Sequence, residues 1–256
     1  MKKLIVATMS MLLVLFASTA DYQKEVDRRT VPEKIMESVV AVDRSSGIVV
    51  HSEENRALIL TAYHTIAGRI RAAACCGCDY GIHAYHFKNP EFVLGIEKYE
   101  VIGVDFDPIT DLAILEVKTN EQLDSVKIST VPTKYGDIAY VGANPLGLYR
   151  SFKQGVVSAN LRIIAGRMVM EVDSGIVFGS SGGGVFNEAG DLIGIVRSVK
   201  GHTTDYCFDL WNEEGEWEGK RCVAVPLPFI GFAVHQLAIR GFLLHGRYSD
   251  DFSYLK

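Results

Sequence analysis

Short apolar runs of strand length, each ended by glycine or a polar turn, follow one another from Val39 onward. Typical runs are SVVAVD, GIVVHS, RALILTA, DLAILEV and DIAYVGA, and most of them are rich in Val and Ile. Such runs at regular spacing are typical of strands, and helical periodicity over ten or more residues is nearly absent. The pattern predicts an all-β protein, built as a sandwich or a barrel.

The one exception is the terminal segment PFIGFAVHQLAIRGFLL, which begins at about Pro228. Helical spacing is found at Phe232, His235, Gln236 and Ile239. We therefore expect a helix that closes the domain against its own barrel. A partner-binding or membrane helix is the less favoured alternative, because Gln236 and Arg240 interrupt its apolar surface.

The length of 256 residues is enough to bury one large β-rich core or two small packed halves. The segment from about 119 to 132 is the best candidate for a junction between such halves. A formal net charge of -5 and the lack of a basic block speak against nucleic acid as a partner. No cofactor motif is evident, and none is predicted.

The N-terminus has the order of features of a secretory signal. Lys2 and Lys3 precede an apolar run from Leu4 to about Phe16, and small residues up to Ala20 follow it. An uncleaved membrane anchor is the alternative, but the run is short for about 30 Å of hydrocarbon. We therefore expect residues 1–20 to be a cleaved signal, 21–36 an N-terminal segment, and the protein to be secreted or periplasmic, with only transient membrane contact.

An exported chain meets oxidising conditions, which makes its five cysteines relevant. Cys207 and Cys222 flank FDLWNEEGEWEGKR, whose central Glu-Glu-Gly is typical of a hairpin tip. A disulfide between these two cysteines could staple that hairpin.

The other three cysteines lie close together, in CCGCDYGIHAYH. This stretch holds potential metal ligands, but their spacing matches no familiar zinc pattern. A disulfide with one thiol left over is favoured over a metal site, so no metal is predicted. The potential ligands are Cys75, Cys76, Cys78, His83 and His86.

The stretch VFGSSGGGVF sets two serines among glycines, as a flexible turn or a nucleophile turn would. A serine hydroxyl attacks a carbonyl when a base takes its proton and backbone N–H groups hold the oxyanion. A glycine two residues ahead of the serine lets both N–H groups point into one hole. Gly179 stands in that position only if Ser181, and not Ser180, is the nucleophile.

A serine nucleophile needs a histidine base and a carboxylate that orients it. Rigid scaffolds typically present such side chains where a buried strand meets a turn. His64 stands at the end of RALILTAYHTI, where a buried strand gives way to a turn. Asp111 opens the apolar strand of DPITDLAILEV and is the candidate to hold the imidazole. Asp107 fits a turn cap better.

Five segments in this order resemble the chymotrypsin-fold, or trypsin-like, serine proteases, in particular the HtrA/Deg branch. They are LTAYH, DPITDLAILEV, VGANPLGLYRSFKQGVVSA, VDSGIVFGSSGGGVFNEAGDLIGI and VAVP. The resemblance implies two packed six-stranded antiparallel β-barrels with a C-terminal helix, in a protease domain over residues 37–256. It also implies an exported serine endopeptidase, a hydrolase that cleaves polypeptides through an acyl-enzyme.

Carried over by matching motif, His64 is general base and acid, Asp111 orients it, and Ser181 is the nucleophile. The resemblance places the oxyanion hole at the N–H groups of Gly179, Ser180 and Ser181.

Ser180 departs from the family, because the HtrA branch has Asn and digestive proteases have Asp there. The chain ends soon after the predicted helix, so no PDZ domain is expected, and oligomerisation stays open. The alternative function is a catalytically silent relative that binds peptides or a partner surface. An esterase on the same fold is a third option.

Overall fold

The computed structural model describes residues 29–76, 81–87, 96–212 and 215–256. Contacts divide the chain into two units, Met1–Thr30 and Val31–Lys256, and the second contains the fold. The predicted signal at 1–20 and the first half of the segment 21–36 lie outside the described residues. Of the helices in the described ranges, none combines the length and apolarity that crossing a bilayer requires.

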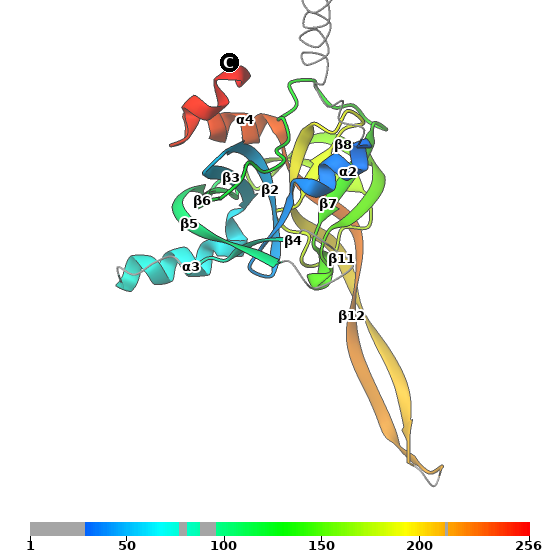
Figure 1. Cartoon of the computed structure of the whole chain (residues 1–256). Helices are drawn as coiled ribbons and strands as arrows, with labels where there is room; N and C mark the ends of the chain where they lie inside the picture. Colours follow the sequence, from blue (N-terminus) through cyan, green and yellow to red (C-terminus); the bar gives the residue numbers. More distant parts are fainter. Residues whose placement is uncertain (1–28, 77–80, 88–95, 213–214) are drawn as a thin grey trace, which may run out of the picture. The chain divides into compact units, whose positions relative to one another are not determined.

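Two closed antiparallel barrels of six strands each form the body of this unit (Figure 1). The first has the strand order β1-β2-β3-β6-β5-β4 and the second β10-β11-β12-β9-β8-β7. The strands of the first are β1 (Val39–Val42), β2 (Ser45–Glu53), β3 (Arg56–Ala62), β4 (Ala84–Phe87), β5 (Ile96–Asp107) and β6 (Leu112–Lys118). Those of the second are β7 (Ile138–Ala143), β8 (Ser151–Ile164), β9 (Arg167–Asp173), β10 (Gly184–Phe186), β11 (Leu192–Trp211) and β12 (Trp217–His235). The predicted fold class is confirmed.

The helices lie at the edges of the barrels. In the described ranges they are α2 (Val31–Glu37), α3 (Tyr63–Cys76), α4 (Gln236–His245) and the 3-10 segments η1 (Pro145–Gly147) and η2 (Ser249–Leu255). A C-terminal helix is confirmed, but its predicted start near Pro228 is wrong. The chain from Gly231 to Val234 is a strand paired to β11 on one side and β9 on the other, and this pairing overrides the helical spacing.

The helix α3 corrects the expectation that long helices are nearly absent. Its 14 residues begin directly after β3. His64 therefore lies in the first turn of a helix, and not in the loop turn that was expected after the strand. Ile66, Ile70 and Ala73 are buried at intervals of four and three residues, and the alanine-rich segment has high helix propensity. Cys75 consequently lies in the last turn of a helix.

Among the residues that the structure describes, three clusters of buried side chains hold the unit together, and the largest joins the two barrels. It combines Leu58 of the first barrel with Phe186 and Val234 of the second, and adds Ile239 of α4 and Phe252 of η2. The other two fill the barrel interiors. Between Lys118 and Ile138 the connecting chain runs along both barrels, hydrogen bonding to Val49 O and Leu192 O.

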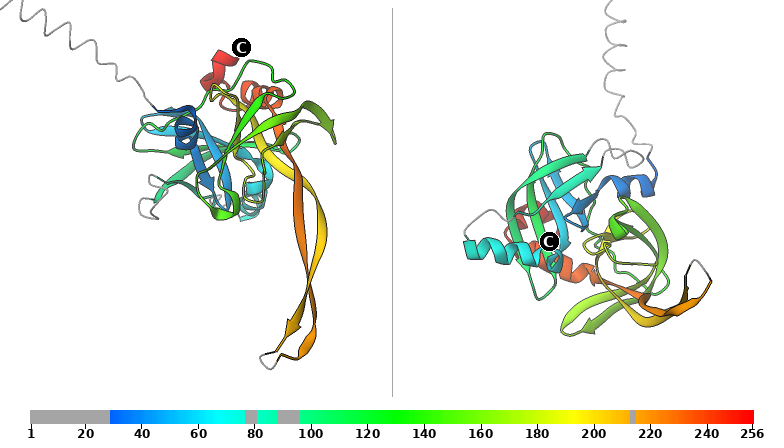
Figure 2. Two further views of the ribbon diagram at one scale, coloured as in Figure 1. Left: turned by 90° about the vertical axis from the view of Figure 1, so that its right-hand side faces the viewer. Right: turned by 90° about the horizontal axis from the view of Figure 1, so that it is seen from below.

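The strands β11 and β12 continue beyond the second barrel as a two-stranded ribbon (Figure 2). A disulfide joins Cys207 to Cys222, which lie directly opposite each other in the ribbon. The turn at its far end is closed by hydrogen bonds from Asn212 N–H to Glu216 O and from Gly215 N–H to Asn212 O.

The side chain of His235 caps α4. It precedes the helix in an extended conformation, and its Nδ1 accepts a hydrogen bond from the N–H of Leu237 at 3.1 Å. His235 is buried, and burial lowers its pKa below the ordinary 6.5 because the charged imidazole is desolvated. Protonation at Nδ1 would also remove the acceptor that caps the helix.

We therefore predict that stability falls as pH drops below about 6.5. In that range the histidine of the unfolded chain takes up a proton while folded His235 stays neutral, so protons favour unfolding. A His235→Asn variant keeps a capping acceptor that does not titrate, and should lose less stability between pH 7 and pH 5.

Urea unfolding at both pH values measures this difference. Replacement of the exposed His245 at the other end of α4 by Asn is the control, and should keep the wild-type pH dependence. Equal losses in wild type and His235→Asn would contradict the prediction.

Candidate active site

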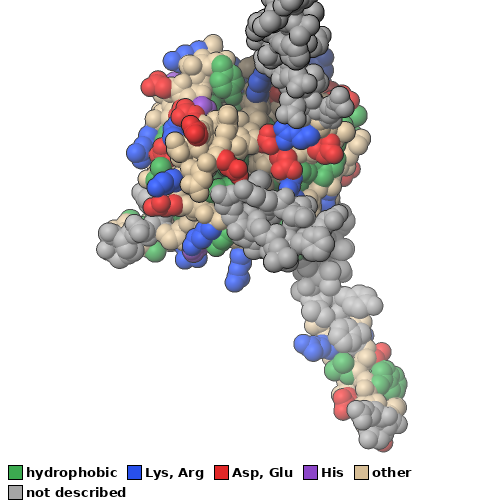
Figure 3. Space-filling view, viewed as in Figure 1, with side chains coloured by type: hydrophobic (Ala, Val, Ile, Leu, Met, Phe, Trp, Pro, Cys, Tyr) green, Lys and Arg blue, Asp and Glu red, His purple; other side chains and the backbone are tan. Residues whose placement is uncertain are grey.

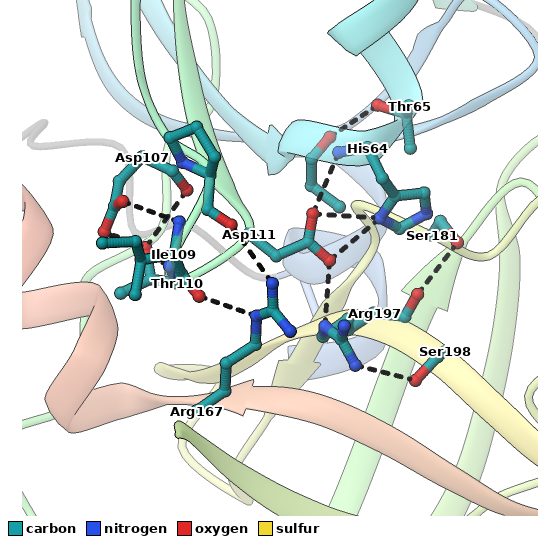
Figure 4. Close-up of polar contacts among 12 residues, drawn as sticks. His64, Thr65, Asp107, Ile109, Thr110, Asp111, Arg167, Ser181, Arg197 and Ser198 are labelled. Carbon is teal, nitrogen blue, oxygen red and sulfur yellow. Dashed lines mark hydrogen bonds and ion pairs between the residues drawn. The ribbon is translucent and has the colours of Figure 1, made fainter. Parts of the chain in front are cut away.

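His64 and Asp111 are in contact, as their predicted roles require (Figure 4). The Nδ1 atom of His64 lies 3.0 Å from Oδ2 of Asp111, and its backbone N–H donates to Oδ1 at 2.9 Å. The Asp111 side chain is only 7% exposed, whereas that of His64 is 46% exposed. A buried carboxylate thus holds the Nδ1 edge of an imidazole that is itself partly exposed to solvent.

The turn before β6 orients the side chain of Asp111 toward His64. Asp111 has a positive φ of 66°, its N–H donates to the carbonyl of Asp107, and its carbonyl accepts from Tyr63 N–H. The carboxylate of Asp107 accepts from the N–H of Ile109 at 2.8 Å, so the predicted turn cap is confirmed. Arg167 of β9 donates to the carbonyl of Ile109 at 2.7 Å and ties this turn to the second barrel.

Glycines shape the turn that carries Ser181. Gly179 and Gly182 have φ of 86° and 81°, a region that side chains rarely adopt. A Cβ atom on Gly182 would overlap the carbonyl oxygen of Ser46 and the hydroxyl of Thr61. The turn can therefore pack against the first barrel only with glycine at that position.

The hydroxyl of Ser181 donates to the backbone carbonyl of Arg197 at 3.3 Å. Figure 4 shows the imidazole of His64 pointing toward Ser181. Within the described ranges, however, no hydrogen bond joins the two side chains. A rotation of the Ser181 side chain away from Arg197 would be needed to make one.

The backbone donors of the turn differ in their availability. In the described part of the chain, the N–H groups of Gly179 and Ser181 have no acceptor. The N–H of Ser180 donates to the carbonyl of Val177 at 3.1 Å. The turn itself uses the Ser180 donor in this conformation, which leaves the N–H groups of Gly179 and Ser181 as the available donors for the predicted oxyanion hole.

Ser46, a fully buried residue of β2, connects the Ser181 turn to the first barrel. Its hydroxyl donates to the carbonyl of Gly179 at 2.9 Å, and its N–H donates to the carbonyl of Ser181 at 2.9 Å. The same hydroxyl accepts from Asn144 N–H, and the hydroxyl of Thr61 donates to the carbonyl of Ser46. Sequence reasoning missed Ser46, which stands in an apolar strand without any motif.

Arg197 lies near the expected substrate pocket, but sequence reasoning did not connect it with Asp111. Its Nε lies 3.0 Å from Oδ2 of Asp111, an ion pair without a hydrogen bond from Nε, and its Nη1 donates to Ser198 Oγ. The carboxylate of Asp111 is thus shared between an imidazole and a guanidinium (Figure 4).

The predicted cysteine and histidine loop is described only in part. Cys75 is an exposed free thiol, and Nδ1 of His83 lies 3.3 Å from a carboxylate oxygen of Asp43. Cys78 and the side chains of Cys76 and His86 lie outside the described residues, so the choice between a disulfide and a metal site there stays untested.

One other cluster, His51, Glu53 and Asp251, brings potential ligand atoms within 4.8 Å of one another. Arg56 donates two hydrogen bonds to Asp251, at 3.0 and 2.8 Å, and its guanidinium already supplies the positive charge. The cluster is best described as an ion-pair network between β2, β3 and η2.

The model of the trypsin-like peptidase domain matches residues 45–195. The chain belongs to this family. It is 35% identical to the serine endoprotease DegS of Salmonella typhimurium over 102 residues, which are 38% of this chain and 29% of DegS. To the periplasmic serine endoprotease DegP of the same species it is 30% identical over 107 residues, 40% of this chain and 22% of DegP.

The chain therefore spans less than a third of the length of these two relatives. Among solved structures, Rv3671c of M. tuberculosis H37Rv, crystallised as an inactive serine-to-alanine mutant, shares the fold with a TM-score of 0.56. The likeness covers 86% of this chain and 92% of that one, at 16% identity. This chain is a trypsin-like peptidase domain homologous to the DegS and DegP proteases.

We predict that Ser46→Ala lowers the free energy of unfolding by about 1–3 kcal/mol, because the carbonyl of Gly179 and the N–H of Asn144 lose a buried partner. The neighbouring Ser45→Ala is the matched control, since it makes none of these contacts, and should change stability by less than about 0.5 kcal/mol. Urea unfolding measures both variants. A loss for Ser46→Ala as small as that expected for Ser45→Ala would show that the hydrogen bonds of the Ser46 hydroxyl do not stabilise the fold.

Proposed function

We propose that the protein is an exported serine endopeptidase in which Ser181, His64 and Asp111 act as a catalytic triad. The observation that carries this proposal is the buried contact of Asp111 with Nδ1 of His64, whose ring points toward Ser181. Two N–H groups without an acceptor in the described structure, at Gly179 and Ser181, support it further. Membership of the trypsin-like peptidase family agrees with this chemistry.

The proposed reaction begins when the Ser181 hydroxyl leaves the carbonyl of Arg197 and donates to Nε2 of His64. Ser181 Oγ then attacks the peptide carbonyl while His64 takes its proton, and the carboxylate of Asp111 stabilises the imidazolium. The N–H groups of Gly179 and Ser181 hold the oxyanion, each worth about 2.7–4 kcal/mol of the barrier by analogy with a single donor. His64 returns the proton to the leaving amine, and water releases the acyl group.

Arg197 places a positive charge beside the Asp111 carboxylate, which the sequence motif alone does not predict. Its guanidinium neutralises part of the Asp111 charge and holds the carboxylate at Oδ2. The same positive charge opposes the imidazolium that forms on His64 during attack. Arg197 therefore helps to orient Asp111 while reducing the electrostatic gain that Asp111 can offer.

The proposal includes export, with residues 1–20 as the signal, 21–36 as an N-terminal segment and 37–256 as the protease domain. The Cys207–Cys222 disulfide fits a secreted or periplasmic location, because disulfides persist in oxidising compartments. Unfolded polypeptides are the proposed substrates.

A second candidate is a catalytically silent protein that binds peptides with the same surface. It is favoured by one observation, the hydrogen bond of the Ser181 hydroxyl to Arg197 in place of one to His64. In such a protein the hydroxyl would keep this bond, and Ser181 would not be activated.

The experiment that separates these functions is casein cleavage by protein lacking residues 1–20. Wild type should cleave unfolded casein, and Ser181→Ala should leave almost nothing above background. Ser180→Ala is the matched control, because Ser180 is buried in the same turn and should retain activity within about threefold. Equal cleavage by wild type and Ser181→Ala, or none by wild type, would contradict the proposal.

A further inference from the structure

The ribbon formed by β11 and β12 has two long edges. The strand β10 pairs with β11 only up to Ile195, and β9 pairs with β12 only from Gly231 to Val234. Beyond these points the two strands pair only with each other in the described structure, as far as Trp211 and Trp217. Each edge offers backbone N–H and C=O groups to an added strand.

The edge of β11 begins at the candidate nucleophile. Gly182 N–H donates to the carbonyl of Val196, and the carbonyl of the next residue, Arg197, accepts the hydroxyl of Ser181. From there β11 runs away from the barrel (Figure 2). At about 3.3 Å per residue, the stretch to Trp211 is on the order of 45 Å long.

The disulfide pair shows which backbone groups face this edge. The Cα atoms of Cys207 and Cys222 are 4.0 Å apart, which fits a non-hydrogen-bonded antiparallel pair at about 4.5 Å and not a bonded pair at about 5.5 Å. The N–H and C=O of Cys207 therefore face away from β12. The register is unbroken from Gly201 to Leu210, and bonded and non-bonded pairs alternate along it. The backbone N–H and C=O groups of Gly201, Thr203 and Asp205 therefore also point away from β12.

Two prolines distinguish the other edge. Pro226 lies opposite Thr203 and Pro228 opposite Gly201, so both prolines occupy non-hydrogen-bonded pairs. Their backbone nitrogens point away from β11, on the outer edge of β12, and a proline nitrogen has no hydrogen to donate to an added strand. Proline is a common protection of exposed edges. Between Leu192 and Trp211 the strand β11 contains no proline.

The far end of the ribbon carries an apolar pair. Trp211 and Trp217 lie opposite each other and are 62% and 59% exposed. Figure 3 shows hydrophobic side chains beside acidic ones at this end. Exposed tryptophans of this kind are common anchors for an apolar side chain of a partner.

We propose that the edge of β11 from Gly201 to Trp211 binds the polypeptide substrate as an added strand, well beyond the residues next to Ser181. This proposal rests on the proposed protease function. Every strand pair in the two barrels is antiparallel, so the added strand should be antiparallel to β11. The substrate then enters at the tryptophan pair and runs toward Ser181, with on the order of 12–15 residues before the cleaved bond on the ribbon.

The continuity of this edge with Ser181 favours a substrate over a second copy of the chain. A dimer that paired β11 with β11 would cover the edge that leads to the nucleophile. The proline-free edge is also the one that reaches the site, whereas the edge of β12 carries prolines and does not.

The test uses two opposed substitutions, Asp205→Pro on β11 and Ala224→Pro on β12. These residues face each other, and each proline removes one outward N–H without removing a bond between the strands. The substrates are two peptides around one casein cleavage site, with 4 or 16 residues before the cleaved bond. Asp205→Pro should lower kcat/KM for the long peptide about three- to tenfold, the value of one hydrogen bond, and leave the short peptide unchanged.

Ala224→Pro should leave both peptides at wild-type rates, and Thr203→Pro should repeat the effect of Asp205→Pro. Thermal unfolding checks that all three variants fold. If wild type cleaves both peptides equally well, or if the two opposed prolines act alike, the edge proposal is wrong while the protease function stands.

A binding measurement keeps the two proposals separate. Calorimetry with the Ser181→Ala protein should show tighter binding of the long peptide than of the short one, and Asp205→Pro should remove the difference, whether or not wild type cleaves. A wild-type dimer in sedimentation that Asp205→Pro converts to monomer, with no change in peptide binding, would assign the edge to a second copy and overturn the proposal.

Discussion

The two hydrogen bonds of Ser46 to the Ser181 turn are the contact on which the site depends. His64 and Asp111 belong to the first barrel and Ser181 to the second, so their meeting requires the barrels to be held in register. Ser46 makes this connection through the backbone of Gly179 and Ser181, in a fully buried position where hydrogen bonds gain strength. The apolar cluster shared by the barrels brings them together, and Ser46 sets the turn.

Two arginines add polar contacts across the same boundary. Arg197 of β11 reaches Asp111, and Arg167 of β9 holds the turn that precedes it through the carbonyl of Ile109. The position of the Asp111 carboxylate is therefore decided by both barrels. The same strand β11 that carries Arg197 continues as the ribbon, so the site and the proposed substrate edge form one structural element.

The fold class and the three triad candidates could be predicted because each depends on local pattern. Strand-length runs indicate a β-sandwich or a barrel, the resemblance to chymotrypsin-fold proteases implies two barrels, and His64 and Asp111 stand where apolar runs end or begin. The contacts of Ser46 with Gly179 and of Arg197 with Asp111 could not be predicted, because these pairs are more than 80 residues apart in the chain and form only where the barrels meet. The start of α4 was misplaced for a similar reason, since strand pairing decided against helical spacing. The helix α3 did carry a signal, its alanine-rich sequence.

The central claim is that His64 activates Ser181, and covalent labelling tests it most directly. Folded protein would be treated with a fluorophosphonate, digested, and mapped by mass spectrometry. The account predicts one phosphonyl adduct, on Ser181, and its loss in His64→Ala. An adduct on Ser180, labelling that survives His64→Ala, or no adduct on folded wild type would contradict it.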